Sequence, residues 1–332
     1  MFNPRSSRNL LSTVLLLGAS FFCDAVFAQV REMRMRLDWV PSGIYAALYQ
    51  AQQNGYYARE GLNVTILPGK GSNITMDGLA AGDIDIGFVS CWGLAVGVSK
   101  GRDLVSVATY TGKNGFAFIF GSDAGVKTLG DLSGKSIVVT PGSFETLLYP
   151  AVLASQGLPG NLMRQVNVDA AQKVPTFARG QADVVVTHNA YGVPLIQQQR
   201  QASSITWGSV GFVLPDYCLA VTRQQLAKEP QLVEKFLRAS YASAKDAATN
   251  PSDAVAATIK LEPLLDRSIT EKQWRLMTEL FYSDDSKSCP HGWHSPSDWS
   301  KALETLKKYG GLEGSITDHG KFYTNQFFNC KR

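Results

Sequence analysis

A cysteine and two histidines near the C-terminus are spaced as metal ligands can be. Cys289, His291 and His294 lie within the segment CPHGWH, and a loop that contains Pro and Gly could bring two of them to one ion. The alternative is a cysteine engaged in a disulfide beside two surface histidines. We favour this alternative and predict no metal site.

Three common enzyme motifs are absent from the sequence. It contains no Walker loop, no His-Glu-x-x-His and no Gly-x-Gly-x-x-Gly. These motifs mark P-loop NTPases, zinc proteases and dinucleotide-binding folds. We therefore predict no catalytic residues, no cofactor and a protein that is not an enzyme.

Two Pro-Gly turns each deliver a hydroxyl residue to the start of a predicted helix. Ser72 precedes a helix over 74–81, and Ser143 precedes a helix over 144–155. The free amides and the positive dipole end at a helix start suit an anion or a carbonyl oxygen. The alternative is that both serines are ordinary N-caps, with or without a ligand.

Aromatic and polar side chains follow the predicted strands. Trp39 and Trp92 come directly after strands, where an indole could stack on a planar ligand or belong to the core. In open α/β sheets, ligands bind beyond the carboxyl ends of the strands. The predicted ligand-binding residues at those ends are Trp39, Tyr45, Ser72, Asn73, Cys91, Trp92, Ser143, His188 and Asn189.

Strand-like and helix-like periods alternate along the first third of the chain. Ser42 could cap a helix that ends at Gly55. Strands alternating with helices indicate right-handed βαβ units and a mainly parallel sheet. The predicted strands cover 33–38, 62–67, 84–89 and 104–110, and the predicted helices cover 44–54 and 74–81.

A second cycle resembles the first. The segment GLAAGDIDIGFVS (78–90) aligns with TFARGQADVVVTH (176–188) at an offset of 98. Gly82 then matches Gly180, and Asp85 matches Asp183. Chance similarity between βα units is the alternative, but the match favours two α/β lobes of related topology.

The C-terminal part is mostly helical after one predicted strand at 219–221. Its predicted helices cover 230–248, 252–259, 270–281 and 297–309. Because this part has too few strands for its own sheet, we expect it to pack on the first lobe rather than form a third domain. The chain would cross between lobes near 111–117 and 207–217. Lobe 1 would hold 29–114 and 215–332, and lobe 2 would hold 115–214.

The N-terminus has the pattern of a signal peptide. Arg5 and Arg8 precede an apolar stretch over 10–22, and cleavage is expected after Ala28. Phe22 disfavours lipid attachment at Cys23. The formal net charge of +4 becomes about +3 without residues 1–28, which is too mild for a nucleic-acid partner. We therefore predict export to the periplasm.

Four cysteines would remain in that oxidising compartment. Cys289 and Cys330 lie in one C-terminal segment, so we predict a disulfide between them. Cys91 and Cys218 either form a second disulfide or are free buried thiols.

The segment LDWVPSGIYAALYQAQQNGYYAREGLNVTI (37–66) resembles the NMT1/THI5-like family. The segments 71–88, 126–139 and 177–186 extend the resemblance. This family includes binding proteins for thiamin-precursor pyrimidines, riboflavin, sulfonates, taurine and nitrate. The resemblance implies the type II periplasmic-binding-protein fold, with two α/β lobes, two crossovers and a ligand cleft between them. It also implies an ABC permease and an ATPase at the inner membrane as partners.

The chain departs from part of that family. Tyr45 stands where pyrimidine-binding members and pyrimidine synthases usually have His, and the CCCFC motif of the synthases is absent. We therefore predict a monomeric periplasmic solute-binding component of an ABC importer. Its ligand would be a small aromatic or heterocyclic molecule, with an anionic group allowed. The first alternative is a pyrimidine-precursor synthase of the THI5 type, which needs a lysine and a reactive histidine in the cleft. Only His188 is placed for that role. The second alternative is a signalling role.

Overall fold

The computed structural model describes Met1, residues 30–212 and residues 215–331. The predicted signal peptide, apart from Met1, therefore lies outside the described residues. Among residues 30–212 and 215–331, no helix combines the length and the apolar character that a membrane crossing needs.

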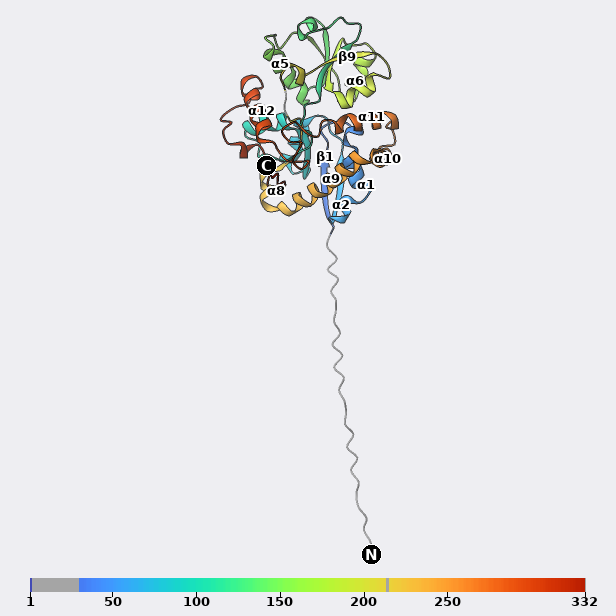
Figure 1. Ribbon diagram of the computed structural model, residues 1–332, viewed down its shortest axis with the longest axis vertical. Coiled ribbons are helices and arrows are strands. Elements are labelled where there is room, and N and C mark those ends of the chain that lie inside the picture. Colours follow the sequence, from blue (N-terminus) through green and yellow to red (C-terminus); the bar gives the residue numbers. More distant parts are fainter. Residues whose placement is uncertain (2–29, 213–214, 332) are drawn as a thin grey trace.

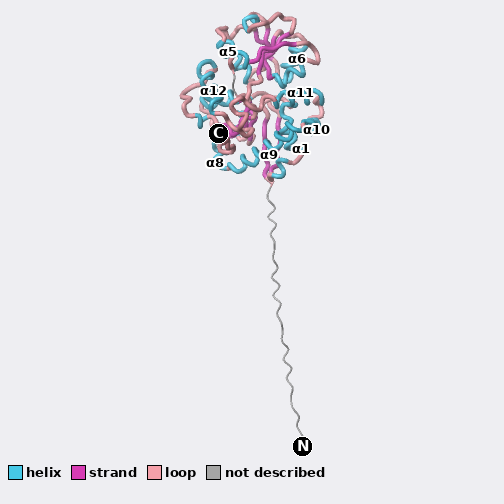
Figure 2. The backbone as a smooth tube through the Cα atoms, in the orientation of Figure 1, coloured by secondary structure: helices cyan, strands magenta, loops and turns pink. Residues whose placement is uncertain are grey.

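Two five-stranded sheets form the centres of two lobes (Figures 1 and 2). The sheet of the first lobe has the order β2 (Leu62–Leu67), β1 (Arg31–Arg36), β3 (Ile86–Ser90), β10 (Tyr217–Thr222) and β4 (Leu104–Thr109). The sheet of the second lobe has the order β7 (Arg164–Asn167), β6 (Ser136–Val139), β8 (Val184–His188), β5 (Phe116–Gly121) and β9 (Ala202–Thr206). The prediction of two lobes is confirmed.

The strand directions differ from the expected mainly parallel sheet. β1 pairs in parallel with β2 and β3, and β6 pairs in parallel with β7 and β8. β10 and β5, however, run antiparallel to both of their neighbours. Each of these two strands enters its sheet directly from the other lobe. Without a crossover helix to return the chain, the strand runs in the opposite direction.

The chain passes between the sheets twice, after β4 and after β9. The two crossing segments are hydrogen-bonded to each other, because the Asp216 N–H donates to the Thr111 carbonyl and the Tyr217 N–H donates to the Thr111 hydroxyl, both at 2.9 Å. The lobe boundaries at 114/115 and 214/215 stay a prediction.

Helices flank both sheets. In the first lobe these are the 3-10 turn η1 (Gly43–Tyr45), α1 (Ala46–Gln53), α2 (Tyr56–Arg59), α3 (Ser72–Ala81) and α4 (Cys91–Ser99). In the second lobe they are η2 (Leu129–Leu132), α5 (Phe144–Ser155), α6 (Ala170–Ala178), α7 (Asn189–Ile196) and η3 (Gly208–Val210). The C-terminal part adds α8 (Arg223–Lys228), α9 (Pro230–Thr249), α10 (Pro251–Leu261), α11 (Arg267–Thr278), α12 (Pro296–Tyr309) and η4 (His319–Lys321).

None of the three serines predicted as N-caps makes a side-chain cap hydrogen bond; Ser143 holds the cap position of α5 without one. Ser42 precedes η1, and its hydroxyl has no hydrogen-bond partner among the described residues. Ser72 is the first residue of α3 rather than its cap, since Gly71 takes the cap position with a φ of 119°. The Ser72 hydroxyl donates a hydrogen bond to Asp38, outside the helix.

The C-terminal helices contact both lobes. α9 packs on α1 and α2, and α10 packs on α1, so much of this part covers the first lobe. α11 also contacts α7, and α12 also contacts α5, across the lobe boundary. In Figure 1, α11 and α12 lie at the level where the two lobes meet.

The repeated sequence segments occupy equivalent places. Asp85 accepts a hydrogen bond from the Arg34 N–H within β1, and Asp183 accepts one from the Ser136 N–H at the start of β6, both at 2.7 Å. The glycines before them, Gly82 and Gly180, both have a φ of 75°. The two segments therefore build the same turn between a helix and a parallel strand in each lobe.

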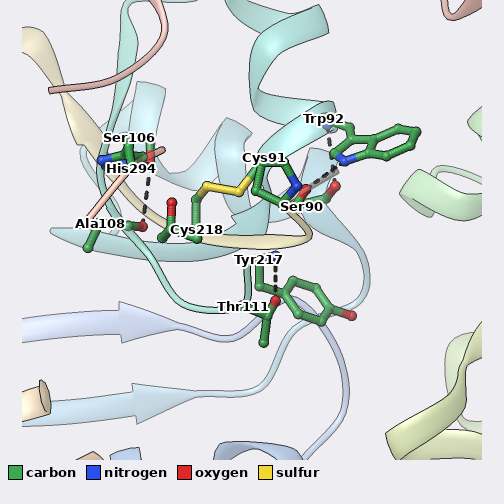
Figure 3. The surroundings of a disulfide bond; sticks show 12 residues. Ser90, Cys91, Trp92, Ser106, Ala108, Thr111, Tyr217, Cys218 and His294 are labelled. Atoms are coloured by element: carbon green, nitrogen blue, oxygen red, sulfur yellow. Dashed lines mark hydrogen bonds between the residues drawn. A yellow bond between two sulfur atoms is a disulfide. The ribbon is translucent and has the colours of Figure 1, made fainter. Parts of the chain in front are cut away.

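Two disulfides are present. The predicted pair Cys289–Cys330 is confirmed. Cys91 and Cys218 are also joined, so the alternative of free thiols is wrong. Figure 3 shows this second bond connecting the start of α4 to β10 beside Trp92 and Tyr217.

Candidate ligand-binding site

A small cavity lies between the lobes at the carboxyl ends of the central strands. We call it the interlobe cavity. Its volume is about 10 Å³, room for roughly one water molecule. A ring-shaped solute therefore needs a wider arrangement of lobes or side chains. The cavity is lined by Asp38, Trp39, Ile44, Phe116, Glu145, Thr187, His188, Tyr191 and Tyr217.

Asp38 is the acidic group on the first-lobe wall. Its Oδ1 accepts a hydrogen bond from the Ser72 hydroxyl. Burial raises the pKa of Asp38 to about 8, the Ser72 hydroxyl opposes the rise, and the carboxylates of Glu145 and Asp216 add to it. Near neutral pH this carboxyl is therefore largely protonated and can donate a hydrogen bond as well as accept one.

An ion pair carries the charge of the second-lobe wall. The Lys173 ammonium on α6 donates to Glu145 on α5, and both side chains are buried. Lys173 Nζ also lies 5.5 Å from the ring centroid of Trp39 in the first lobe. Burial lowers the pKa of Lys173, and the Glu145 carboxylate opposes that change. This cation–π contact therefore links the charge of one lobe to the indole of the other.

His188 and Asp216 meet where the chain crosses between lobes. His188 Nε2 lies 3.2 Å from Asp216 Oδ2, close enough for an ion pair with a protonated imidazole but not aligned as a hydrogen bond. The same Oδ2 accepts from the Gly115 N–H at 2.9 Å. A Cβ on Gly115 would lie 2.2 Å from His188 Nε2, so only glycine lets the imidazole approach. Asp216 Oδ1 has no hydrogen-bond partner within the described part of the chain.

A larger groove of about 370 Å³ opens on the other side of the Ser72–Asp38 hydrogen bond. Phe144, Leu147 and Leu148 supply its apolar side. Its two cations are engaged elsewhere: Arg102 pairs with Asp77 and Lys100 with Glu313. We favour the interlobe cavity as the ligand site because it lies at the strand ends and its charged groups face one another.

The predicted site residues divide between the two spaces. Trp39 and His188 line the interlobe cavity, whereas Ser72 and Asn73 line the larger groove. Tyr45 lies in the core, and its hydroxyl accepts a hydrogen bond from the Trp39 N–H at 3.0 Å. It therefore positions Trp39 instead of lining the cavity.

The remaining predicted residues support the walls. Cys91 is in a disulfide, and the buried Trp92 indole donates to the Pro215 carbonyl at 2.6 Å. The Ser143 and Thr146 hydroxyls share a hydrogen bond of 2.8 Å. Asn189 begins α7, and its Oδ1 is buried without a partner among the residues described.

Sequence reasoning missed the charged residues of the cavity. Lys173 does leave a signal: it falls on the apolar stripe of α6 formed by Ala170, Val174 and Phe177, where a lysine must be buried. Asp38 lies two residues beyond the end of β1, in the region where ligand-binding residues gather. Asp216 and Glu145 leave no such signal, because only the lobe arrangement brings them to the cavity.

The CPHGWH segment forms part of the first-lobe core. His291 Nε2 lies 2.7 Å from the Tyr110 carbonyl, and His294 Nε2 lies 2.7 Å from the Ser106 hydroxyl. Burial lowers the pKa of His291 to about 4 and that of His294 to about 3. The expectation of two surface histidines is wrong, since His294 is fully buried. With Cys289 in a disulfide, these three side chains are committed to structural contacts.

Known proteins of several functions are similar to this chain. The riboflavin-binding protein RibY of Chloroflexus aurantiacus is 23% identical over 90% of this chain and 86% of its own length. The 4-amino-5-hydroxymethyl-2-methylpyrimidine phosphate synthase of Aspergillus parasiticus is 21% identical over 88% of this chain and 86% of its own.

A solved structure supports the fold. The alkanesulfonate-binding protein SsuA of Xanthomonas axonopodis pv. citri, bound to MOPS, superposes with a TM-score of 0.69 at 15% identity. The superposition covers 89% of this chain and 99% of that one. The fold is therefore that of the periplasmic binding proteins. The family model described as NMT1/THI5 like matches residues 44–254. The chain belongs to the NMT1/THI5-like family.

Proposed function

We propose that the protein is the solute-binding component of an ABC importer and that it closes its two lobes over a small organic ligand. The observation that carries the proposal is the interlobe cavity, which draws aromatic and charged side chains from both lobes. Ligand contacts to both walls favour the closed arrangement, and such a population shift needs no covalent step.

The cavity favours a ring with hydrogen-bond donors over a bare anion. The carboxyl groups of Asp38 and Glu145 line it, and Asp216 Oδ2 lies 3.2 Å from Nε2 of the lining residue His188. The ammonium of Lys173 is already paired with Glu145. An added sulfonate or nitrate would find the Lys173 ammonium already neutralised by Glu145, whereas ring N–H groups would meet carboxyl acceptors. Trp39, Tyr191 and Tyr217 supply aromatic surface for the ring.

The environment of Lys173 favours a binding protein over the synthase alternative. The synthase alternative needs a lysine and a histidine there, and Lys173 and His188 both lie beside the cavity. The Lys173 nitrogen, however, is buried and donates to Glu145, so it does not offer a free amine to a pyridoxal phosphate aldehyde. An imine absorbance band in the purified protein would contradict the proposal.

The periplasm is the proposed location, with a permease and an ATPase of the inner membrane as partners. Two disulfides suit an oxidising compartment. The binding proteins similar to this chain support the same placement. The protein would act as a monomer that delivers its ligand to the permease.

Titration calorimetry tests the proposal. An aminopyrimidine, riboflavin, benzoate, taurine and nitrate would each be added to the protein that lacks residues 1–28. We expect at least one ring compound to bind with a Kd well below 1 mM, and taurine and nitrate not to bind. If none of the ring compounds binds below about 1 mM, the proposed ligand class fails.

Two variants locate the bound ring. Trp39→Phe changes the interlobe cavity and is expected to weaken binding, because the smaller ring loses contact area. Leu147→Ser is the matched control in the larger groove, where the leucine is 60% exposed. Weaker binding by the Leu147 variant alone would place the ligand in the groove instead.

A further inference from the structure

The side chain of Gln273 joins the two lobes beside the interlobe cavity. It lies on α11 and is 2% exposed. Its Oε1 accepts from the Gly43 N–H of the first lobe at 2.8 Å, and its Nε2 donates to the Tyr191 carbonyl of the second lobe at 2.9 Å. Gly43 precedes Ile44, and both Ile44 and Tyr191 line the cavity. One amide group therefore connects the two walls.

α11 is anchored to the first lobe. The Trp274 indole, next to Gln273, is fully buried and donates to the Ala247 carbonyl of α9 at 2.9 Å. Gly43 packs so closely on α11 that an added Cβ would lie 2.2 Å from the Thr270 carbonyl oxygen. When the lobes separate, α11 therefore stays with the first lobe, and the bond to Tyr191 is the one that breaks.

We propose that Gln273 is a positioning residue that clasps the lobes and sets how far they close. Its planar amide holds Oε1 and Nε2 at a fixed separation, so both bonds form together only when Gly43 and Tyr191 are close. A bond made in one of two states raises the population of that state. The clasp therefore favours the closed arrangement without touching the ligand.

A second hydrogen bond between the lobes, from Asn73 to Gly142, is weaker because it is exposed to solvent. Asn73 Nδ2 donates to the Gly142 carbonyl at 3.2 Å in an exposed place on the opposite flank. Water can replace that bond when the lobes open. The amide of Gln273 is buried, and its loss leaves polar groups to be solvated again. Gln273 is therefore the stronger of the two contacts.

Gln273→Glu tests the clasp with little change in size. The carboxylate still accepts from Gly43 but opposes the Tyr191 carbonyl with a second acceptor. Glu271→Gln is the matched control, an exposed position on the same helix. Single-molecule energy transfer between dyes at the exposed positions Lys235 and Gln199 reports the ratio of closed to open molecules without any ligand.

The ratio is expected to fall by about three- to tenfold in Gln273→Glu and to stay unchanged in Glu271→Gln. Gln273→Met, which removes both bonds without burying a charge, gives the same reading if the first variant does not fold. An unchanged ratio in the folded variants, an equal fall in the control, or a wild type without closed molecules would overturn the clasp. The inference rests on the proposed lobe closure. Because its test uses no ligand, it can fail separately from the proposed function.

Discussion

The ends of β3 and β8 share one backbone pattern but carry different side chains. After β3 the Cys91 N–H donates to the Asp216 carbonyl at 2.7 Å, and after β8 the Asn189 N–H donates to the Gly115 carbonyl at 2.8 Å. Tyr217 pairs with Ser90 in the first lobe as Phe116 pairs with His188 in the second.

The ends of β3 and β8 differ in how they are held and in which side chains they place near the interlobe cavity. The first lobe joins the two strands here with the Cys91–Cys218 disulfide, whereas the second lobe has Asn189 and Ala117 at the corresponding positions and brings His188 within 3.2 Å of Asp216. The same backbone arrangement therefore occurs twice, at the end of β3 (the first-lobe platform) and at the end of β8 (the second-lobe platform). The first-lobe platform is fixed by a disulfide, whereas the second-lobe platform places the His188 side chain on the wall of the interlobe cavity.

Removal of the Cys91–Cys218 disulfide should have the largest effect on stability. This bond spans 127 residues and encloses the whole second lobe, whereas Cys289–Cys330 spans 41. Loop entropy predicts a loss of about 5 kcal/mol for the Cys91→Ala/Cys218→Ala variant and about 4 kcal/mol for the other pair. Denaturant unfolding measures both losses. A smaller loss for the longer loop would contradict a special role for the first-lobe platform.

Lys173→Met should cost about 3–5 kcal/mol, because it leaves the Glu145 carboxylate buried without its partner. The double variant with Glu145→Gln should regain most of that loss. Thr75 is the matched position in the first lobe by the offset of 98, and its hydroxyl donates to the Leu37 carbonyl at 2.8 Å. Thr75→Val should cost only about 1 kcal/mol. Equal losses at the two positions would show that the second lobe holds no special charge pair.

Asp38→Asn should change how stability depends on pH. Because burial raises the pKa of Asp38 from 3.8 to about 8, the folded state holds a proton that the unfolded state releases. The wild-type contribution from Asp38 is therefore fully present below pH 4 and is lost as pH rises toward 8. The variant removes that slope and should be more stable than the wild type at pH 8 by a few kcal/mol.

Urea unfolding between pH 5 and 8 measures the slope. Glu145, Asp216 and Lys173 interact electrostatically with Asp38, His188 lines the same cavity, and all four remain in both proteins. The difference between the two curves therefore reports the Asp38 proton together with its coupling to these groups. Parallel curves for the two proteins would contradict a buried, protonated carboxyl on the first-lobe wall.

The repeated aspartates should show the smallest effects. Asp85→Asn and Asp183→Asn each weaken a hydrogen bond from the backbone of the adjacent parallel strand, at a cost of about 1 kcal/mol. Asp183 also accepts from the Ser136 hydroxyl, and the Ser136 N–H and hydroxyl lower its pKa. Its contribution is present above its unfolded pKa and is lost in acid. Thermal melts should show a slightly larger loss for Asp183→Asn, and a much larger loss at Asp85 would break the equivalence.

Local periodicity predicted most of the elements. The predicted strand 62–67 matches β2, and the helices predicted from Pro230 and near Ser297 match α9 and α12. Alternation and apolar stripes reflect contacts along the chain, so a single sequence carries them. The repeat around Asp85 and Asp183 also predicted two related lobes.

Arrangement across the lobes could not be predicted in this way. The antiparallel direction of β10 depends on how the chain re-enters the first sheet, and no local pattern records that path. The cavity joins Asp38, Glu145 and Tyr217, which are far apart in sequence. Trp92 followed a strand as Trp39 does, yet only Trp39 lines the cavity, because the Trp92 indole is held by the Pro215 carbonyl.

The proposed function requires that a small ring compound binds between the lobes. Native mass spectrometry of gently purified protein detects such a compound, with the wild type compared with Trp39→Leu and Leu147→Ser. We expect one retained molecule per chain with ring absorbance in the wild type and the Leu147 variant, and its loss in the folded Trp39 variant. Retention by the Trp39 variant, or a retained bare anion such as a sulfonate, would contradict ring binding between the lobes.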